Sequence, residues 1–320
     1  QLRRIGKLDE PVVHPTRPAP QPWGYRSHMT FNAMPVDETD PSRGGRLGFW
    51  SSDNTHVVPV DLCHILHPAL TDLFEQIDLQ APEITRVKFQ VGADPDDRML
   101  VLETSDDLPP EVEIDLPVSV NFLLSDNEPA NLIGRSHVEY RVRERNFRLT
   151  AGGFFQVNQP VTAMVVEDAM RRLALDGDEV VLDLYSGVGL FTRFIAEQAD
   201  FVLSVESYPP AVTDAEENLA DLDNVEIVEG AVEAVLEDLE GPIDAALVDP
   251  PRMGLNREVV DELGRLGPST LVYVSCDPAT LARDVKWLGK HGYTLVDAQP
   301  FDMFPQTFHI ECVATLRRGV

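Results

Sequence analysis

Asp183-Leu184-Tyr185-Ser186-Gly187-Val188-Gly189 joins an apolar run over residues 179–184 to a helical pattern over residues 189–199. Its two glycines let the backbone turn tightly and approach a ligand at the N-terminus of the following helix. The next apolar run ends roughly 20 residues later at Glu206, whose carboxylate can accept from both hydroxyls of an adenosine ribose. Thr192 stands where the third glycine of the dinucleotide fingerprint would fall, so the spacing favours S-adenosylmethionine over NAD as the cofactor. A sharp strand-to-helix turn without a ligand is the alternative interpretation.

Strand and helix patterns alternate on both sides of this loop, from about residue 158 to the C-terminus. The predicted strands cover residues 179–184, 201–206, 225–229, 245–248, 270–275, 293–301 and 309–317. The predicted helices cover residues 160–173, 189–199, 209–220, 232–239, 257–266 and 279–289. This alternation is typical of crossover units. We therefore predict an α/β fold with a mostly parallel, doubly wound sheet covered on both faces.

The N-terminal part of the chain has a different pattern. Residues 1–24 are rich in proline and predict an extended lead-in. Residues 25–150 contain mostly strand patterns separated by clusters of Gly, Pro and Asp, which predicts a smaller, strand-rich α+β domain. We therefore divide the chain into residues 1–24, 25–150 and 151–320.

One run of the middle domain, residues 136–150, alternates apolar and arginine side chains. The apolar members are Val138, Tyr140 and Val142, and the arginines are Arg141, Arg143 and Arg145. If the run is one strand, the three arginines project together from its exposed face. They either contact the phosphates of a nucleic acid or form a salt-bridged surface.

The composition is that of an ordinary globular protein. Of the 320 residues, 43% are apolar and 25% are charged, which excludes wholesale disorder. No apolar run approaches the roughly 18 residues of a membrane span, so we expect no membrane partner. Three cysteines (Cys63, Cys276 and Cys312) are too few for a secreted disulfide scaffold, and they predict a cytoplasmic protein.

The charge is strongly acidic. Asp and Glu number 54 against 26 Lys and Arg, a net charge of −28, and only four of the basic residues are lysines. This composition resembles that of salt-loving microbes, and we expect a halophilic archaeal source. At molar salt the Debye length is about 3 Å, so local arginine patches can still bind a nucleic acid.

Two further segments end predicted strands and therefore line the same crevice. They are Val248-Asp249-Pro250-Pro251-Arg252 and Ser275-Cys276-Asp277-Pro278. Asp277 is a predicted N-cap and Pro278 the first helical residue, which places the Cys276 thiol at a helix N-terminus. That position favours the nucleophilic thiolate. A buried, inert cysteine is the alternative.

The last predicted strand contains a candidate base. His309 and Glu311 are two residues apart, so they share one face if this segment is extended. From spacing alone, Glu311 is either a general base or one more solvated acid.

Five ordered segments resemble the family of S-adenosylmethionine-dependent RNA uridine-C5 methyltransferases, which includes the 23S rRNA and tRNA 5-methyluridine enzymes. These segments are Phe154-Phe155-Gln156-Val157-Asn158, residues 183–189, Asp249-Pro250-Pro251-Arg252, Ser275-Cys276-Asp277-Pro278-Ala279-Thr280-Leu281, and residues 302–311. Their order and spacing match over roughly residues 22–320. The resemblance implies a class I, Rossmann-like methyltransferase domain preceded by a middle RNA-binding domain.

The resemblance also implies a role for each catalytic residue. Cys276 attacks carbon 6 of a target uracil, carbon 5 becomes an enolate-like nucleophile that takes the cofactor's methyl group, and Glu311 removes the carbon 5 proton. The chemistry agrees, because carbon 5 of uracil is a poor nucleophile until covalent addition activates the ring, and a base is needed to break the adduct.

The cofactor positions implied by the resemblance are Gln156, Tyr185, Gly187, Glu206 and Asp249. The sequence departs from the family pattern at three positions. Leu190 stands where many members have Asn or Thr, Ala231 where Asn or Asp is frequent, and Asp277 where Asn is frequent. A capping position tolerates the last change.

Cys63 resembles the last ligand of the iron–sulfur cluster that many family members carry. The three upstream cysteines are absent, and one thiolate cannot hold a four-iron cluster, so we expect no metal in this chain. Either an N-terminal part with those cysteines is missing, which the start at Gln1 favours, or this member lost the [4Fe-4S] cluster. In this chain Cys63 can equally be a buried apolar residue.

The implied partner is structured RNA. Arg26 lies in a segment, Tyr25-Arg26, that resembles the family's RNA contact, and Phe154 is a candidate platform for a flipped base. Arg141, Arg143 and Arg145 are candidate phosphate contacts. The middle domain and the missing cluster resemble the 23S rRNA branch more closely, with the tRNA T-loop uridine as the alternative. We expect a monomer.

Four other protein classes fit these residues less well. An amino-directed base methyltransferase usually has an aromatic residue where Arg252 stands, and a cytosine-C5 enzyme has its nucleophile in the loop that here reads Pro250-Pro251-Arg252. A non-catalytic RNA-binding protein with this fold would be expected to lack Cys276 or Glu311. A Rossmann dehydrogenase is disfavoured by the G-x-G spacing.

Overall fold

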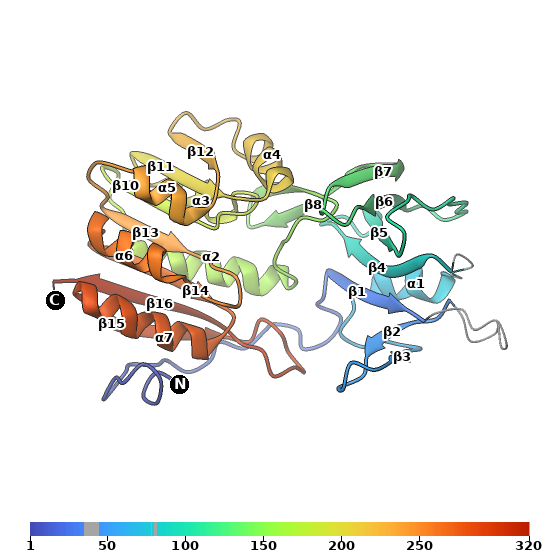
Figure 1. Cartoon of the computed structure of the whole chain (residues 1–320), viewed down its shortest axis with the longest axis horizontal. Helices are drawn as coiled ribbons and strands as arrows, with labels where there is room; N and C mark the ends of the chain where they lie inside the picture. The colour runs from blue at the N-terminus through green and yellow to red at the C-terminus, as the bar shows by residue number, and fades with distance from the viewer. Residues whose placement is uncertain (35–44, 78, 80–81, 320) are drawn as a thin grey trace. The chain divides into compact units, whose positions relative to one another are not determined.

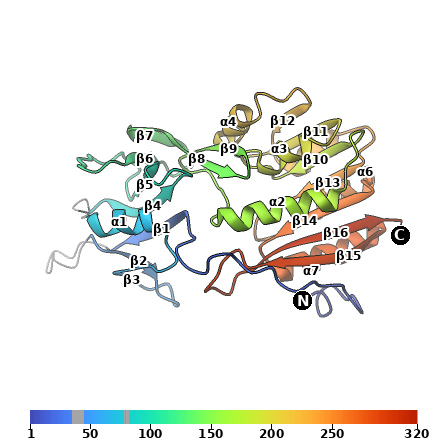
Figure 2. The same cartoon turned by 180° about the vertical axis from the view of Figure 1, so that it is seen from behind.

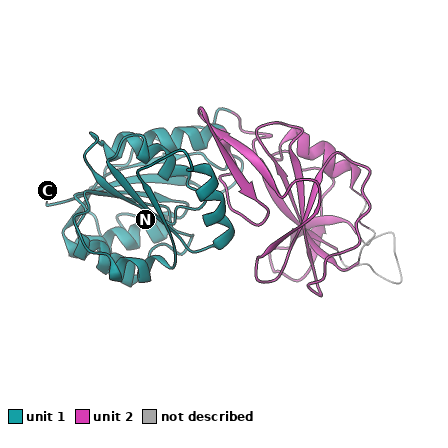
Figure 3. Ribbon diagram, turned by 90° about the horizontal axis from the view of Figure 1, so that it is seen from above, with its two compact units in different colours: residues 1–20, 160–320 teal, residues 21–159 magenta. Residues whose placement is uncertain are grey.

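The computed structural model describes residues 1–34, 45–77, 79 and 82–319. The chain forms two compact units (Figure 3): unit 1 comprises residues 1–20 and 160–320, and unit 2 comprises residues 21–159. Within the described ranges, no helix is both long enough and apolar enough to cross a membrane.

Unit 1 is built on a seven-stranded sheet (Figure 1). Its spatial order is β12(Val225–Glu229), β11(Phe201–Glu206), β10(Val180–Leu184), β13(Ala245–Val248), β14(Thr270–Ser275), β16(Glu311–Arg318) and β15(Tyr293–Phe301). The first five strands, from β12 to β14, run parallel to one another, and β16 runs antiparallel to both β14 and β15. The predicted α/β fold with a mostly parallel, doubly wound sheet is confirmed.

Helices cover both faces of this sheet. They are α2(Gln159–Leu173), α3(Leu190–Ala196), α4(Pro209–Asn218), α5(Val232–Asp238), α6(Arg257–Leu266), α7(Pro278–Leu288) and the 3₁₀ helix η2(Gly289–His291). Helices α6 and α7 lie in front of the sheet in Figure 1, and α2 lies on the opposite face, as Figure 2 shows. Every residue of β13 and β14 is buried, which explains why these strands are continuous apolar runs in the sequence.

The proline-rich N-terminal segment packs along the edge strand β15. Val13 forms a parallel bridge with Ala298, and Arg17 forms one with Phe301. The His14 amide donates to the Ala298 carbonyl at 2.9 Å, and the Ala298 amide donates to the Val12 carbonyl at 2.9 Å. The segment therefore covers hydrogen-bonding groups that an edge strand would expose. The sequence predicts an extended lead-in over residues 1–24 but neither this long-range pairing nor the turn over residues 2–5, where the Ile5 amide donates to the Gln1 carbonyl at 2.8 Å.

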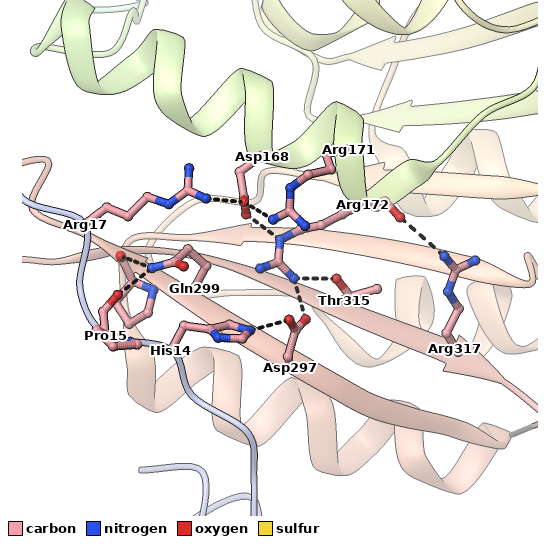
Figure 4. Close-up of polar contacts among 11 residues, drawn as sticks. His14, Pro15, Arg17, Asp168, Arg171, Arg172, Asp297, Gln299, Thr315 and Arg317 are labelled. Atoms are coloured by element: carbon pink, nitrogen blue, oxygen red, sulfur yellow. Dashed lines mark hydrogen bonds and ion pairs between the residues drawn. The ribbon is translucent and has the colours of Figure 1, made fainter.

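A cluster of charged side chains fixes the same segment (Figure 4). Asp168 of α2 is fully buried and accepts from Arg172, while Arg17 approaches it at 3.4 Å. Asp297 of β15 accepts from Arg172 and lies 2.6 Å from His14 Nε2. Since a buried carboxylate is stable only when paired, the cluster ties the N-terminal segment, α2 and β15 together.

Unit 2 is strand-rich, as predicted. Its main sheet has the order β3(Val57–Pro59), β2(Leu47–Trp50), β1(His28–Ala33), β4(Ile84–Val91), β5(Arg98–Thr104), β6(Ser119–Leu123) and β7(Pro129–Ile133). Only the β5–β6 pair is parallel among the described pairs. Helix α1(Pro68–Gln76) packs on this sheet, where Phe74 and Phe89 both contact the ring of Phe31.

The predicted single strand over residues 136–150 is wrong. The run forms a hairpin of β8(His137–Val142) and β9(Arg145–Thr150), and Arg143 sits in its turn with φ of 54°. Arg141 instead donates to Glu144 at 3.0 Å. The three arginines therefore do not form a row, because the chain reverses direction between the second and the third.

Unit 2 ends nine residues beyond the predicted domain boundary at residue 150. Residues 151–159 pack against the unit 2 sheet: the Ser27 amide donates to the Val157 carbonyl at 2.9 Å. Lys88 Nζ of β4 donates to the Gly153 carbonyl at 2.9 Å. Tyr140 stacks on Phe155 with ring centroids 4.5 Å apart. These contacts place the Phe154–Gln156 motif in unit 2 rather than with the parallel sheet.

Candidate active site

The carboxyl ends of the parallel strands bring the predicted cofactor and catalytic residues of unit 1 to one edge. Tyr185 follows β10, Glu206 ends β11, Asp249 follows β13 and Cys276 follows β14. Glu311 reaches the same edge from the other direction, because it is the first residue of the antiparallel strand β16. This edge is where open α/β sheets bind their ligands.

Cys276 and Glu311 are brought together by strand register. Ser275 of β14 pairs with Cys312 of β16. Cys276 is the next residue after one member of this pair, and Glu311 is the residue before the other. Residues that are 35 positions apart in the sequence therefore end two neighbouring strands on the same side.

The cofactor loop is held open by its own hydrogen bonds. The Gly187 amide donates to Glu206 Oε2 at 2.9 Å, and Glu206 Oε1 accepts from the amides of Ser207 (2.7 Å) and Tyr208 (2.9 Å). Gly187 has φ of 56°, and a Cβ built there would meet no atom within 4 Å. The glycine is therefore required for its backbone conformation, and space lies beside the loop for a ligand.

Asp183 and Thr192 support this loop from beneath. Asp183 is fully buried, and Thr192 Oγ1 donates to its Oδ2 at 2.6 Å. Burial raises the pKa of Asp183 to about 7. Thr192, the residue in place of a third glycine, thus has a structural role that glycine could not fill.

The residues at this edge fit an adenosine-containing cofactor. Glu206 lies at the end of its strand and is only partly buried, as a ribose-binding carboxylate must be. Open space beside Gly187 leaves room for the ligand's approach to the α3 N-terminus, whose cap is Gly189 with φ of 82°. Tyr185, also at positive φ (63°), turns the chain out of β10.

The helix cap beside Cys276 is as predicted, but other groups oppose its effect on the thiol. Asp277 Oδ1 accepts from the amides of Ala279 at 2.7 Å and Thr280 at 3.0 Å. Burial and the negative charges of Glu311 and Asp249 nevertheless raise the pKa of the Cys276 thiol to about 11, against the opposing charge of Arg252. The predicted effect of the helix N-terminus on the thiol is therefore opposed by burial and by two neighbouring carboxylates.

Glu311 is buried rather than solvated. The residue is only 2% exposed, and no described residue donates a hydrogen bond to its Oε1. Burial, with the nearby charge of Asp249, raises the pKa of Glu311 well above its usual range. Glu311 is therefore a buried carboxyl group with one oxygen that no described residue donates to, which excludes the solvated-acid interpretation.

His309 and Glu311 do not belong to one strand, so the spacing argument for a shared face does not apply. The strand begins only at Glu311, and His309 lies in the preceding loop. Its ring lies instead against Phe308, with centroids 4.1 Å apart, and Nδ1 is 3.5 Å from Arg252 Nη2.

The other predicted residues lie in unit 2. Gln156 is buried, whereas Phe154 is 66% exposed. Arg26 is partly buried and Nε donates to the His28 carbonyl at 3.2 Å. Cys63 is a free, partly buried thiol 3.8 Å from the sulfur of Met29. Within the described part of the chain, no group of three or more His, Cys, Asp or Glu side chains could hold a metal ion.

Sequence reasoning missed two residues that shape the loop after Asp249. Asp284 of α7 is fully buried and accepts from the Leu255 amide at 2.8 Å and from the Tyr273 hydroxyl at 2.8 Å. Its neighbour Arg283 donates to the Met253 carbonyl at 2.7 Å. The only sequence signal is an acid among apolar positions of the predicted helix over residues 279–289.

Comparisons with known proteins agree with this arrangement. The family described as tRNA (Uracil-5-)-methyltransferase matches residues 133–319. An uncharacterized RNA methyltransferase of Caldanaerobacter subterraneus is 30% identical over 99% of this chain and 77% of its own length. One from Streptomyces avermitilis is 36% identical over 85% of this chain and 64% of its own length.

A solved structure shares the whole fold. The Pyrococcus abyssi tRNA (uracil-54, C5)-methyltransferase, determined in complex with S-adenosyl-L-homocysteine, superposes with a TM-score of 0.74 at 24% identity. The superposition covers 98% of this chain and 80% of that one. The matched family spans more than half of the chain and contains the Cys276–Glu311 edge of the sheet. The chain therefore belongs to the tRNA (uracil-5-)-methyltransferase family of S-adenosylmethionine-dependent RNA methyltransferases.

Proposed function

We propose that this protein methylates carbon 5 of a uridine in structured RNA through a covalent bond between Cys276 and carbon 6 of the base. The observation that carries the proposal is the register of β14 and β16, which sets a cysteine beside a buried glutamic acid whose Oε1 has no described hydrogen-bond donor. A nucleophile and a proton acceptor at adjacent strand ends are what a covalent addition followed by elimination requires.

Five residues are proposed to hold the cofactor. Glu206 accepts from the ribose hydroxyls, and Gly187 lets the backbone approach the ligand. Tyr185 and Asp249 complete the contacts from unit 1. Gln156 of unit 2 is the fifth residue proposed, from the family resemblance, to bind the cofactor. S-adenosylmethionine, when bound there, supplies the methyl group as an electrophilic carbon.

The protein's own residues carry the proton and bond changes. The thiol proton of Cys276 passes to solvent, Sγ bonds to carbon 6, and the electron pair of the 5,6 double bond moves toward carbon 5 and the carbonyl at carbon 4. Once carbon 5 bears the methyl group, Glu311 in its ionised form takes the carbon 5 proton. The released electron pair restores the double bond and expels the thiolate.

The charges around Cys276 bear on the formation of the thiolate. Burial and the negative charges of Glu311 and Asp249 raise the pKa of the thiol to about 11, and the positive charge of Arg252 opposes this shift. Neutralisation of a nearby carboxylate would lower the pKa of the thiol and favour the thiolate.

The proposed RNA is 23S rRNA, with the tRNA T-loop uridine as the alternative. Arg26 and Phe154 of unit 2 are proposed RNA contacts. Arg141, Arg143 and Arg145 remain candidate phosphate contacts, although not as a row. We further propose that unit 2 binds the RNA and that the protein acts as a monomer in a salt-rich cytoplasm, which its net charge of −28 supports.

The test is release of tritium from RNA labelled at carbon 5 of uridine, measured in molar KCl with S-adenosylmethionine. Transcripts of 23S rRNA and of tRNA are compared for the wild type and for Cys276→Ala. Release that requires both the cofactor and Cys276 supports the proposal, and the transcript that releases label identifies the RNA. If the wild type binds the cofactor by calorimetry but releases no tritium from either transcript, uridine-C5 transfer to these RNAs is excluded.

A further inference from the structure

Two loops at the catalytic edge of unit 1 expose large apolar side chains. Phe308 is 89% exposed and Met253 is 80% exposed, the two highest values among the large apolar residues of the described chain. Phe308 lies between β15 and β16, and Met253 lies between β13 and α6. Single exposed apolar side chains are common on protein surfaces, whereas a contiguous exposed patch marks a binding surface, so the contacts around these two residues decide the matter.

The exposed side chains are part of one continuous group. The ring of His309 lies 4.1 Å from that of Phe308 and 5.9 Å from that of Phe304, as measured between centroids. His309 Nδ1 lies 3.5 Å from Arg252 Nη2, which joins the two loops. We call these residues, with Met253, the aromatic rim.

Both loops of the rim are fixed in place. In the first, Arg283 donates to the Met253 carbonyl at 2.7 Å and Asp284 accepts from the Leu255 amide at 2.8 Å. In the second, Thr307 Oγ1 donates to the Phe304 carbonyl at 2.8 Å, and the His309 amide donates to Thr307 Oγ1 at 3.2 Å. The backbone that carries the rim is therefore held by hydrogen bonds, which lowers the entropy that its loops lose when a ligand binds.

The rim adjoins the proposed reactive pair. His309 precedes Glu311 by two residues, and Arg252 follows Asp249 by three. The charge of Arg252 acts on the Cys276 thiol, so the guanidinium lies near the sulfur. A uridine that reaches Cys276 must leave its stack, and the nucleotides beside it lose that stacking as well.

We propose that the aromatic rim binds an unpaired nucleotide adjacent to the target uridine, with its base stacked on Phe308 and His309 and its backbone near Arg252. This proposal rests on the proposed function. Charge and ring chemistry favour RNA as the occupant. The Arg252 guanidinium lies beside the adjacent rings of Phe308 and His309, which makes a local cationic and aromatic surface in a protein of net charge −28. Bases of any sequence can stack on such aromatic side chains.

The test compares Phe308→Ala with Phe308→Tyr on the tritiated transcript that the wild type accepts. Phe308→Ala is expected to raise KM for RNA about tenfold, which corresponds to about 1.4 kcal/mol, with kcat within about twofold of the wild type. Phe308→Tyr, which keeps the ring, is expected to restore the wild-type KM. Val296→Ala removes an exposed apolar side chain from β15 and serves as the matched control, with no change expected in either constant.

The outcomes separate the two proposals. If the wild type releases tritium and Phe308→Ala has the same KM as the wild type, the aromatic rim does not bind RNA, while the proposed function stands. The same conclusion follows if Phe308→Ala instead changes the oligomeric state in sedimentation, since the rim is then a protein interface. If the wild type releases no tritium from either transcript, both proposals fail together.

Discussion

Two carboxylates at the same edge of the sheet have opposite environments. Glu206 accepts backbone hydrogen bonds from the amides of Gly187, Ser207 and Tyr208. Glu311 is buried, and no described donor reaches its Oε1. Glu206 is thus held in place by three backbone amides, whereas Glu311 has a buried oxygen without a described donor and a pKa raised above its usual range.

This difference matches the two tasks we propose for the carboxylates. A ribose-binding carboxylate gains from being ionised and rigid before the ligand arrives. A base that acts once per turnover must instead change its protonation at the right step, and a raised pKa brings that change near the working pH. The contrast teaches that a buried carboxylate oxygen of Glu311 without a described donor suits the role of a base, which must accept a proton during the reaction.

The largest expected effect comes from removal of the nucleophile. We expect Cys276→Ala to lower the rate of tritium release by at least about 10⁴-fold, because carbon 5 is not activated without the addition at carbon 6. Cys312→Ala, which removes the buried thiol from the next strand, is the control and should keep most of the activity. Equal loss in both variants would indicate damage to the fold rather than loss of a nucleophile.

Removal of the base is expected to stop the reaction at a later point. Glu311→Gln should lower turnover about 10³-fold, within the usual range for a lost general base, and should accumulate a covalent protein–RNA adduct. The adduct is detected as a slower band in a denaturing gel. If Glu311→Gln turns over at the wild-type rate, the different environments of Glu206 and Glu311 have no role in catalysis.

The same variant tests the neutral state of Glu311 by stability. Since the folded pKa is raised above the ordinary value of 4.5, its protonation stabilises the fold at low pH, and this contribution is lost as pH rises toward the folded pKa. Wild-type stability should therefore fall more steeply above pH 4.5 than that of Glu311→Gln. Parallel curves from denaturant titrations at several pH values would show that Glu311 is ionised in the free enzyme.

Asp168 provides a buried carboxylate that is fully paired, and its removal should destabilise the protein. Asp168→Asn leaves the buried Arg172 without one of its two acidic partners. We expect a loss of about 3 kcal/mol in the free energy of unfolding, measured by denaturant titration. The exposed Asp200→Asn is the control. A neutral result for Asp168→Asn would mean that the cluster in Figure 4 does not hold the N-terminal segment.

Much of unit 1 follows from the sequence because its signals are local. The strands β13 and β14 are buried on both faces and therefore continuous in apolar residues, and Asp277 and Pro278 mark the start of α7. Cys276, Asp249 and Glu206 could be placed at one edge because parallel strands end on the same side. Their identities as site residues came from the resemblance as much as from the pattern.

The features that the sequence does not reveal depend on contacts between distant segments. The turn at Arg143 lacks the glycine or asparagine that normally signals a positive φ, so the hairpin looked like one strand. Pairing of Val13 with Ala298 joins segments 285 residues apart. The raised pKa of Cys276 comes from burial and from the charges of Glu311 and Asp249, which only the folded chain brings near the thiol.

The smallest of these effects is expected at Glu206. Glu206→Gln keeps an oxygen that can accept from the Gly187 amide but loses the charge, so S-adenosylmethionine should bind about tenfold more weakly by calorimetry, the usual cost of a charge-assisted hydrogen bond. Glu229→Gln, at the end of the neighbouring strand β12, removes a matched exposed charge and should bind normally. A similar weakening in both variants would assign the effect to the net charge of this edge. A loss confined to Glu206→Gln would assign the weaker binding to the ribose contact, and it would separate the binding role of Glu206 from the catalytic role proposed for Glu311.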